Sequence, residues 1–238
     1  MSAPTSIRTA SERTVKSEDS MAPSSAQRSL RLAWLARALH DPELEHGPFE
    51  HGGEAALEVL ERERSGAPHG ELASHYRRIF GHTPGGACPL YELSWLKAGD
   101  FASEQELADI GGFYRAFGVA LSARERMDHV AVELEFLAYL AHLEARAAEE
   151  GREQPREVAR QGQRSFLRDH LGRWTPALFE RMEARAPEGF YLRLALWARL
   201  ELDGLCRELD VRPIVHLGEP AGAAPLVASE ESEEVMLP

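Results

Sequence analysis

The stretch that decides the fold of this 238-residue chain is GGFYRAFGVALSARERMDHVAVELEFLAYLAHLEA, residues 111–145. Its apolar residues recur at helical spacing on more than one face, which predicts two helices joined by a short charged link. A helix that is apolar on several sides is normally central in a bundle, so we expect both helices in the core. The link carries Glu125, Arg126, Asp128 and His129. A polar cluster between two core helices is the first place to expect a functional site.

Helical periodicity continues through most of the remaining chain, and no segment alternates as a strand would. Further helices are predicted at residues 29–39, 53–64, 71–80, 103–118, 156–171, 177–186 and 190–209. A turn is predicted at Trp174-Thr175-Pro176. We therefore expect an all-α chain with a single helical bundle domain at 28–212, whose N- and C-terminal halves are joined by a link near 119–128. The polar segments 1–27 and 213–238 are expected to be disordered tails.

Composition limits the classes of function. The net charge of −12 disfavours nucleic acid as a partner and favours basic ligands such as arginine-containing peptides. Moderate negative charge also simply keeps a protein soluble, and both interpretations stay open. No apolar run is long enough to span a membrane and the N-terminus has no secretory signal, so we expect a cytoplasmic protein without membrane insertion. Cys88 and Cys206 form no CxxC pair, which argues against disulfides and structural zinc.

Enzyme signatures are missing from the sequence. Gly85-Gly86 is not followed by the Gly-Lys-Ser/Thr of a phosphate-binding loop, and there is no HExxH motif. Cys88 has no identifiable catalytic partners. The Asp-His dipeptide occurs twice, at 128–129 and 169–170, in the reverse of the order that an HD-type metal phosphohydrolase requires. We predict no catalytic residues, no metal ligands and no cofactor, and hence a protein that is not an enzyme.

Some polar residues have a structural alternative. Asp128 is a candidate N-cap, with His129 then exposed in the first helical turn. Glu133 and Glu135 lie in an otherwise apolar helix, so at least one is expected to pair with an arginine, a helix N-terminus or a bound cation. The loop at 81–92 is rich in proline and glycine, and is either an irregular connector or a binding surface.

Several segments, in the same order, resemble the TorD/DmsD/NarJ-like chaperones of molybdenum-cofactor oxidoreductases, especially those serving type II enzymes of the dimethyl-sulfoxide-reductase family. The matching segments are Tyr76-Arg-Arg-Ile-Phe80, the loop Gly81 to Glu92, Leu107 to Gly118, Glu125 to His129 with Glu133 to Leu137, and Phe166 to Leu171 with Trp174 and Pro176. The family often has a proline at the positions of Leu90 and Met127. These departures affect local backbone stiffness and leave Asp128 and His129 in place.

The resemblance implies an all-α, TorD-like chaperone that binds the twin-arginine signal peptide of an apo molybdoenzyme catalytic subunit, assists cofactor insertion and delays Tat export. The signal-peptide site that it implies comprises Pro89, Tyr91, Glu92, Phe113, Glu125, Asp128 and His129. Carboxylates would bind the guanidinium groups and an apolar groove the hydrophobic region of the peptide. His129, with an ordinary pKa of about 6.5, would tune binding with pH.

Three questions stay open at this point. The client, whether an enzyme of selenate, chlorate, dimethyl sulfide or hydrocarbon chemistry, is not identified by the sequence. Nor is the oligomeric state, monomer or homodimer. The alternative functions are a small helical metal-dependent hydrolase or nucleotide-binding protein using Asp128 and His129, and a helical adaptor without an export role.

Overall fold

The chain forms a helical bundle in the computed structural model, which describes residues 24–43, 54–68, 70–81, 86–96, 100–121, 126–215 and 220. The helices are α1 (Ser25–Leu39), α2 (Ala55–Gly66), α3 (Glu71–Phe80), a 3₁₀ turn η1 (Glu92–Ser94), α4 (Asp100–Ala116), α5 (Val130–Glu149), α6 (Glu153–Phe166), a π-helical turn η2 (Leu167–Leu171), α7 (Gly172–Arg185) and α8 (Phe190–Glu208). These described residues contain no strand, which confirms the predicted all-α class. None of their helices combines the length and apolarity that crossing a membrane requires.

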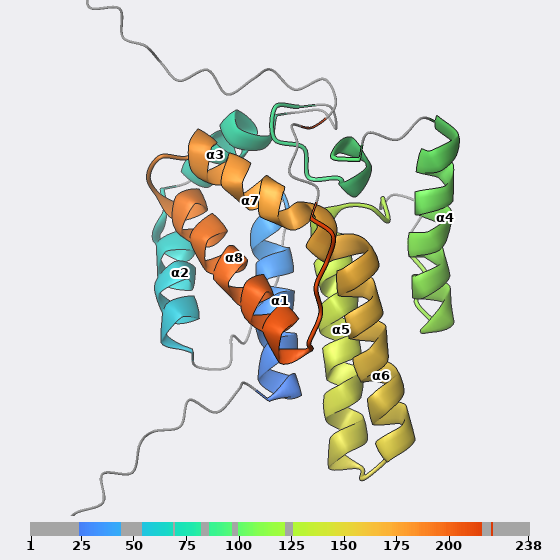
Figure 1. The fold of residues 1–238 in the computed structure, drawn as a ribbon. Helices are drawn as coiled ribbons and strands as arrows, with labels where there is room; N and C mark the ends of the chain where they lie inside the picture. The colour runs from blue at the N-terminus through green and yellow to red at the C-terminus, as the bar shows by residue number, and fades with distance from the viewer. Residues whose placement is uncertain are drawn as a thin grey trace, which may run out of the picture.

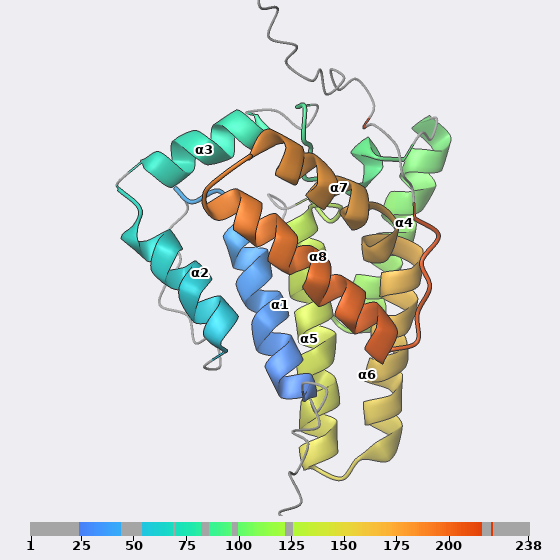
Figure 2. The same cartoon turned by 60° about the vertical axis from the view of Figure 1, so that its left-hand side comes forward.

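Helix α5 is the centre of the bundle, as the sequence predicted. Residues on most of its circumference are buried, including Leu134, Leu137 and Leu140 with no exposed surface. Helices α1 and α6 both run antiparallel to α5 and lie along it, while α8 crosses in front of α1 (Figures 1 and 2). Helices α1 and α5 pack closely enough for the hydroxyl of Ser29 to donate to the backbone carbonyl of Ala138 at 2.9 Å.

Helix α1 begins four residues earlier than its predicted start at residue 29. Ser24 is the N-cap, and its hydroxyl accepts from the Gln27 amide while the Gln27 side chain accepts from the Ser24 amide. This reciprocal capping satisfies two backbone donors that would otherwise have no partner at the helix end. Residues 1–23 and 221–238, which include most of both predicted tails, lie outside the described residues.

Helix α4 differs from its expected place in the core. It begins at Asp100 rather than at residue 103, and it lies at the edge of the bundle (Figures 1 and 2). Only one face is apolar, with Ile110 and Tyr114 buried, whereas charged residues such as Asp109 and Arg115 are exposed on the other faces. A helix with one apolar face is stable at the surface, so the helix containing residues 111–116 covers the core instead of forming its centre.

The predicted turn at Trp174-Thr175-Pro176 is wrong. Pro176 lies inside α7, and the chain bends instead at the π-helical turn between α6 and α7 (Figure 1). Proline removes one helical hydrogen bond, and the hydroxyl of Thr175 donates to the Leu171 carbonyl at 2.7 Å next to that gap. Gly172 follows the bend at a place where a Cβ atom would lie 2.5 Å from the Leu167 carbonyl oxygen and 2.5 Å from Pro213.

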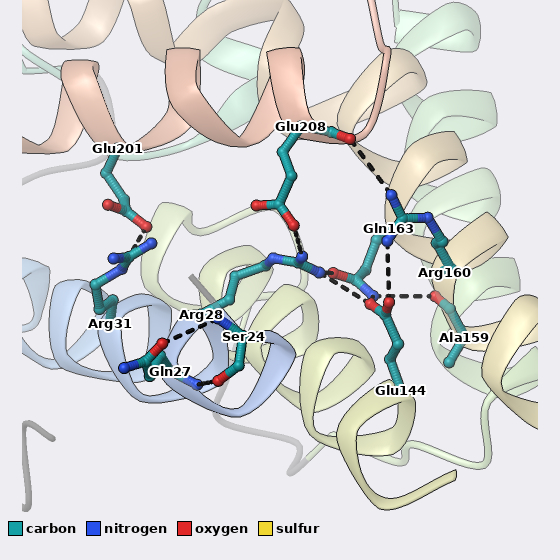
Figure 3. A network of polar contacts seen from close by, with 10 residues as sticks. All are labelled: Ser24, Gln27, Arg28, Arg31, Glu144, Ala159, Arg160, Gln163, Glu201 and Glu208. Atoms are coloured by element: carbon teal, nitrogen blue, oxygen red, sulfur yellow. Dashed lines mark hydrogen bonds and ion pairs between the residues drawn. The ribbon is translucent and has the colours of Figure 1, made fainter. Parts of the chain in front are cut away.

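A buried polar network joins α1, α5, α6 and α8 (Figure 3). The Arg28 side chain is only 2% exposed, and its Nη1 donates to Glu144 at 2.9 Å and to Gln163 at 2.8 Å. Its Nη2 pairs with Glu208 of α8. Arg160 of α6 completes the network by donating to Glu144 at 3.1 Å and to the Glu208 carbonyl.

The network keeps Glu144 ionised. Burial raises the pKa of this carboxyl, but the hydrogen bond from Gln163 and the positive charges of Arg28 and Arg160 outweigh burial and lower the pKa below its ordinary value. The negative charge of Glu144 is therefore stabilised by Gln163 together with its two arginine partners.

We expect Arg28→Ala to lower the free energy of unfolding by about 3–5 kcal/mol, because it takes one of two arginines away from the buried Glu144 carboxylate and leaves the acceptor oxygens of Gln163 and Glu208 without this donor. Chemical denaturation measures the change. Arg156→Ala is the matched control, since the Arg156–Glu153 pair is solvent-exposed and is expected to contribute less than about 1 kcal/mol. Equal losses in the two variants would show that the network does not stabilise the bundle.

Gly172→Ala is expected to lower the free energy of unfolding by about 1–3 kcal/mol, since the added methyl group collides with backbone and with Pro213. Gly112→Ala in α4 is the control, because a Cβ atom there meets nothing within 4 Å. That control is expected to be neutral or to stabilise by about 0.5–1 kcal/mol through helix propensity. Thermal unfolding of both variants tests the pair, and a Gly172→Ala variant as stable as Gly112→Ala would contradict the packing argument.

Candidate functional site

The proline-containing loop and the charged link lie side by side. Their backbones form one antiparallel bridge, in which Tyr91 and His129 are opposite each other. The bridge consists of two backbone hydrogen bonds, from the Glu92 amide to the Asp128 carbonyl and from the Val130 amide to the Leu90 carbonyl, both 2.8 Å. The sequence proposed these two segments as halves of one surface. Their bridged residues, Tyr91 and His129, are 38 positions apart in the chain and are joined through their backbones.

A row of rings crosses this junction, and we call Tyr91, His129 and His40 the aromatic row. The His129 ring lies edge-on to Tyr91 at a centroid distance of 5.0 Å and stacks on His40 of α1 at 5.7 Å. His40 Nε2 lies 3.3 Å from the carboxylate of Glu135, which is 54% exposed. At the other end, the Arg126 guanidinium lies 4.3 Å from the centre of the Tyr91 ring, a cation–π contact.

Asp128 is not the helix cap that the structural alternative assumed. The N-cap of α5 is His129, whose Nδ1 accepts from the Ala131 amide at 3.1 Å. Asp128 has no exposed surface, and its two carboxylate oxygens accept from Arg126 Nε and Nη2 at 3.0 and 2.8 Å. This fork-shaped pair fixes Arg126 over Tyr91, so Asp128 acts through Arg126 rather than at the surface.

Burial lowers the pKa of His129 to about 4, with smaller contributions from the neighbouring His40 and Arg126 charges. The neutral ring agrees with the hydrogen bond that Nδ1 accepts, because a protonated ring has no acceptor nitrogen. The suggested pH tuning of this residue near pH 6.5 is therefore wrong: His129 stays neutral throughout the physiological range. Its place in the row is that of a neutral aromatic ring.

A second cluster lies behind the aromatic row. Glu92 and His170 have no exposed surface, and Glu92 Oε2 is 3.4 Å from His170 Nδ1. Glu133, also fully buried, accepts from Trp174 Nε1 at 3.3 Å, and burial followed by the Glu92 charge raises its pKa well above the ordinary value. The sequence predicted an arginine, a helix N-terminus or a bound cation beside at least one of Glu133 and Glu135. Glu133 lies in the first turn of α5 and meets the Glu92 carboxyl group, and Glu135 meets His40. No arginine of the described residues is ion-paired with either of them.

The predicted site residues thus divide into separate groups. Tyr91 and His129 are half-buried in the aromatic row, whereas Pro89, Glu92 and Asp128 are buried beneath it. Phe113 is half-buried on α4 and packs edge-on against Phe166 at 5.4 Å and His170 at 5.3 Å, next to the second cluster. Glu125 lies outside the described residues.

Two neighbours of the site were missed. His40 carries no sequence signal, because it lies about 90 residues before the link with which it packs. His170 had a signal in the second Asp-His dipeptide, and its burial beside Glu92 distinguishes it from an ordinary surface histidine.

The candidate catalytic groups of the alternative functions are buried or engaged in structural contacts. Burial raises the pKa of Cys88 to about 12, so this thiol is not a nucleophile near neutral pH. Asp128 is paired with Arg126, and His129 uses Nδ1 as a helix cap. The described fold is all-α, and the side chains of Asp128 and His129 are engaged in structural contacts.

The chain belongs to the family described as the nitrate reductase delta subunit, since the sequence model of that family matches residues 48–180, more than half of the chain. This match confirms the resemblance drawn from the sequence. The matched range contains the proline-containing loop, the link and His170.

Individual relatives carry chaperone names. A chaperone protein TorD from Photobacterium profundum is 32% identical over 124 residues, covering 51% of this chain and 56% of that protein. The selenate reductase assembly chaperone protein of Thauera selenatis is 39% identical over 87 residues, 36% of this chain and 44% of the relative. The chlorate reductase assembly chaperone protein of Ideonella dechloratans is 40% identical over 80 residues, which cover 33% of this chain and 40% of that relative. The chain spans about half the length of these curated relatives. Their names are those of chaperones and not of enzymes, in agreement with the prediction that this chain is not an enzyme.

The pKa of His129 predicts a pH dependence of stability. Between about pH 6.5 and 4, His129 is protonated in the unfolded chain but not in the folded chain. The free energy of unfolding therefore falls by up to about 3 kcal/mol as the pH falls through this range. His129→Asn removes the titration and keeps an N-cap residue. Denaturation at a series of pH values measures the effect. From about pH 6.5 to 4, the free energy of unfolding of His129→Asn is expected to fall by about 3 kcal/mol less than that of the wild type.

His142→Gln removes an exposed histidine from the same helix and serves as the control. Parallel pH–stability curves for the wild type and His129→Asn would contradict the low pKa of His129.

Proposed function

We propose that this protein is a cytoplasmic assembly chaperone that binds the twin-arginine signal peptide and the apo form of a molybdenum-cofactor oxidoreductase subunit. It would hold that subunit for cofactor insertion and delay its Tat export. Family membership and the chaperone names of the relatives support this role. The domain that carries it is proposed to span residues 28–212.

The observation that carries the proposal is the aromatic row at the bridged loop and link. Tyr91, His129 and His40 form a continuous aromatic surface, and the exposed carboxylate of Glu135 lies at its end. A twin-arginine peptide combines two guanidinium groups with a following hydrophobic region. The row offers apolar contact for the hydrophobic region, and Glu135 offers an acceptor for a guanidinium group.

The geometry changes the roles proposed for individual residues. Asp128 is already paired with Arg126, so it would position Arg126 and Tyr91 instead of contacting the peptide. Glu92 would position the loop through the bond between its amide and the Asp128 carbonyl. Direct contact is therefore proposed for Tyr91, His129 and Glu135, with the overall negative charge of the protein favouring the encounter.

Calorimetric titration with a panel of twin-arginine signal peptides from molybdenum-cofactor oxidoreductases tests the proposal. At least one peptide is expected to bind, and its twin-lysine counterpart to bind more weakly because lysine lacks the planar fork of arginine. Glu135→Gln and Tyr91→Ala are each expected to weaken binding about tenfold, equivalent to about 1.4 kcal/mol.

Matched controls are Glu153→Gln, at an exposed carboxylate on α6, and Tyr139→Ala, at an exposed tyrosine on α5. Both are expected to bind like the wild type. Tight binding that survives Glu135→Gln and Tyr91→Ala would reject the aromatic row as the site, and no binding to any peptide of the panel would reject the function.

A further inference from the structure

The second cluster brings together three potential metal ligands from three separate elements. Glu92 lies in η1, Glu106 in α4 and His170 in η2, and one ligand atom from each lies within 4.8 Å of the others. No local motif links them, since they are far apart in the sequence. That is why the sequence predicted no metal site.

Two of the three side chains, Glu92 and His170, are fully buried, and their polar atoms lack well-formed hydrogen bonds. Both carboxylate oxygens of Glu92 and both ring nitrogens of His170 are inaccessible and make no hydrogen bond within the described residues. Leaving such atoms unsatisfied is costly, and the Glu133 carboxyl group beside Glu92 can donate to one of the Glu92 oxygens at most. These atoms point to a ligand that the polypeptide does not supply.

The distances around His170 fit a metal ligand. Its Nε2 lies 3.3 Å from a carboxylate oxygen of Asp109, and its Nδ1 lies 3.4 Å from Glu92 Oε2. If the Nε2 proton is directed to Asp109, the lone pair of Nδ1 faces the Glu92 carboxylate, and a cation between them removes the repulsion. The separation of 3.4 Å equals the edge of a tetrahedron whose metal–ligand bonds are about 2.1 Å long, as they are around zinc.

The local charge also favours a divalent cation. The carboxylates of Glu92, Glu106 and Asp109 surround His170. Among the described residues, Arg173 is ion-paired with this group, with its Nη1 3.4 Å from Glu106 and 4.0 Å from Glu92. In the described part of the chain, three carboxylates and one arginine thus meet around His170, a balance that favours a bound cation. The π-helical turn that carries His170 is a conformation found frequently at functional sites.

We propose that Glu92, Glu106 and His170 form a binding site for one divalent transition-metal ion of the zinc class. Nitrogen and carboxylate oxygen ligands suit Zn²⁺, and three protein ligands leave a fourth position for water. Asp109 would orient the imidazole through Nε2, as carboxylates beside metal-bound histidines commonly do. Glu106 and Asp109 are partly exposed, so an ion would enter from the α4 side. The proposal is tested separately from the proposed peptide binding, because Zn²⁺ binding is measured without a peptide.

Titration of the chelator-treated full chain with Zn²⁺ tests the proposal. Calorimetry and metal analysis are expected to give one ion per chain, with an accompanying rise in the thermal unfolding temperature. Loss of one of three ligands in Glu106→Gln is expected to weaken binding at least tenfold. Asp109→Asn is expected to weaken it about tenfold or more, through the loss of the group that orients His170. His170→Gln is expected to abolish it.

Glu104→Gln, an exposed carboxylate on the same helix as Glu106, is the control and is expected to bind Zn²⁺ like the wild type. If His170→Gln does not fold, Glu106→Gln decides, because that side chain is at the edge of the cluster. Absence of saturable binding in the wild type would overturn the site, leaving a histidine that is ion-paired with two carboxylates. Equal affinity in Glu106→Gln and Glu104→Gln would also overturn it, because the ion would then be bound elsewhere.

Discussion

The buried pair of Arg28 and Glu144 is the contact on which the arrangement of the bundle depends. Hydrophobic packing alone allows α1 to slide along the small and apolar residues of α5, whereas a buried charge has a favourable energy only at one register. Because Arg28 also meets Gln163 of α6 and Glu208 of α8, this register fixes four helices at once (Figure 3). The pair therefore specifies how the apolar faces meet, in addition to any stability it contributes.

Fixing α1 against α5 has a direct consequence at the other end of both helices. Helix α1 ends at Leu39, and the next residue, His40, stacks on His129 at the start of α5. A shift of α1 by one helical turn, about 5.4 Å, would remove His40 from the aromatic row. The polar network at one end of α5 and the surface at its other end are thus connected by two rigid helices.

Much of the fold could be predicted from the sequence, and the site only in part. The helical class, the central place of α5 and the association of the loop with the link follow from periodicity and from the family resemblance. Pro176 was misread because local propensity predicts a break, whereas the preceding π-helical turn lets the helix continue. The structural alternative for Asp128, a helix N-cap, is filled by His129 instead, because the Asp128 carboxylate pairs with Arg126, a contact that the local sequence pattern does not reveal. Contacts such as His40 with His129 depend on tertiary packing and have no local signal.

Glu92 connects the surface and the buried cluster within a single residue. Its backbone amide bonds to the Asp128 carbonyl, which keeps the loop against the link, while its carboxylate faces His170 in the interior. A fully buried carboxylate needs a partner that neutralises or hydrogen-bonds it. The position of that partner therefore influences the position of the η1 backbone. A cation shared by Glu92 and His170 would hold η1 against η2, and through the bridge it would also fix Tyr91 beside His129. In that case the second cluster would set the geometry of the surface, although none of its side chains would have to touch a bound peptide.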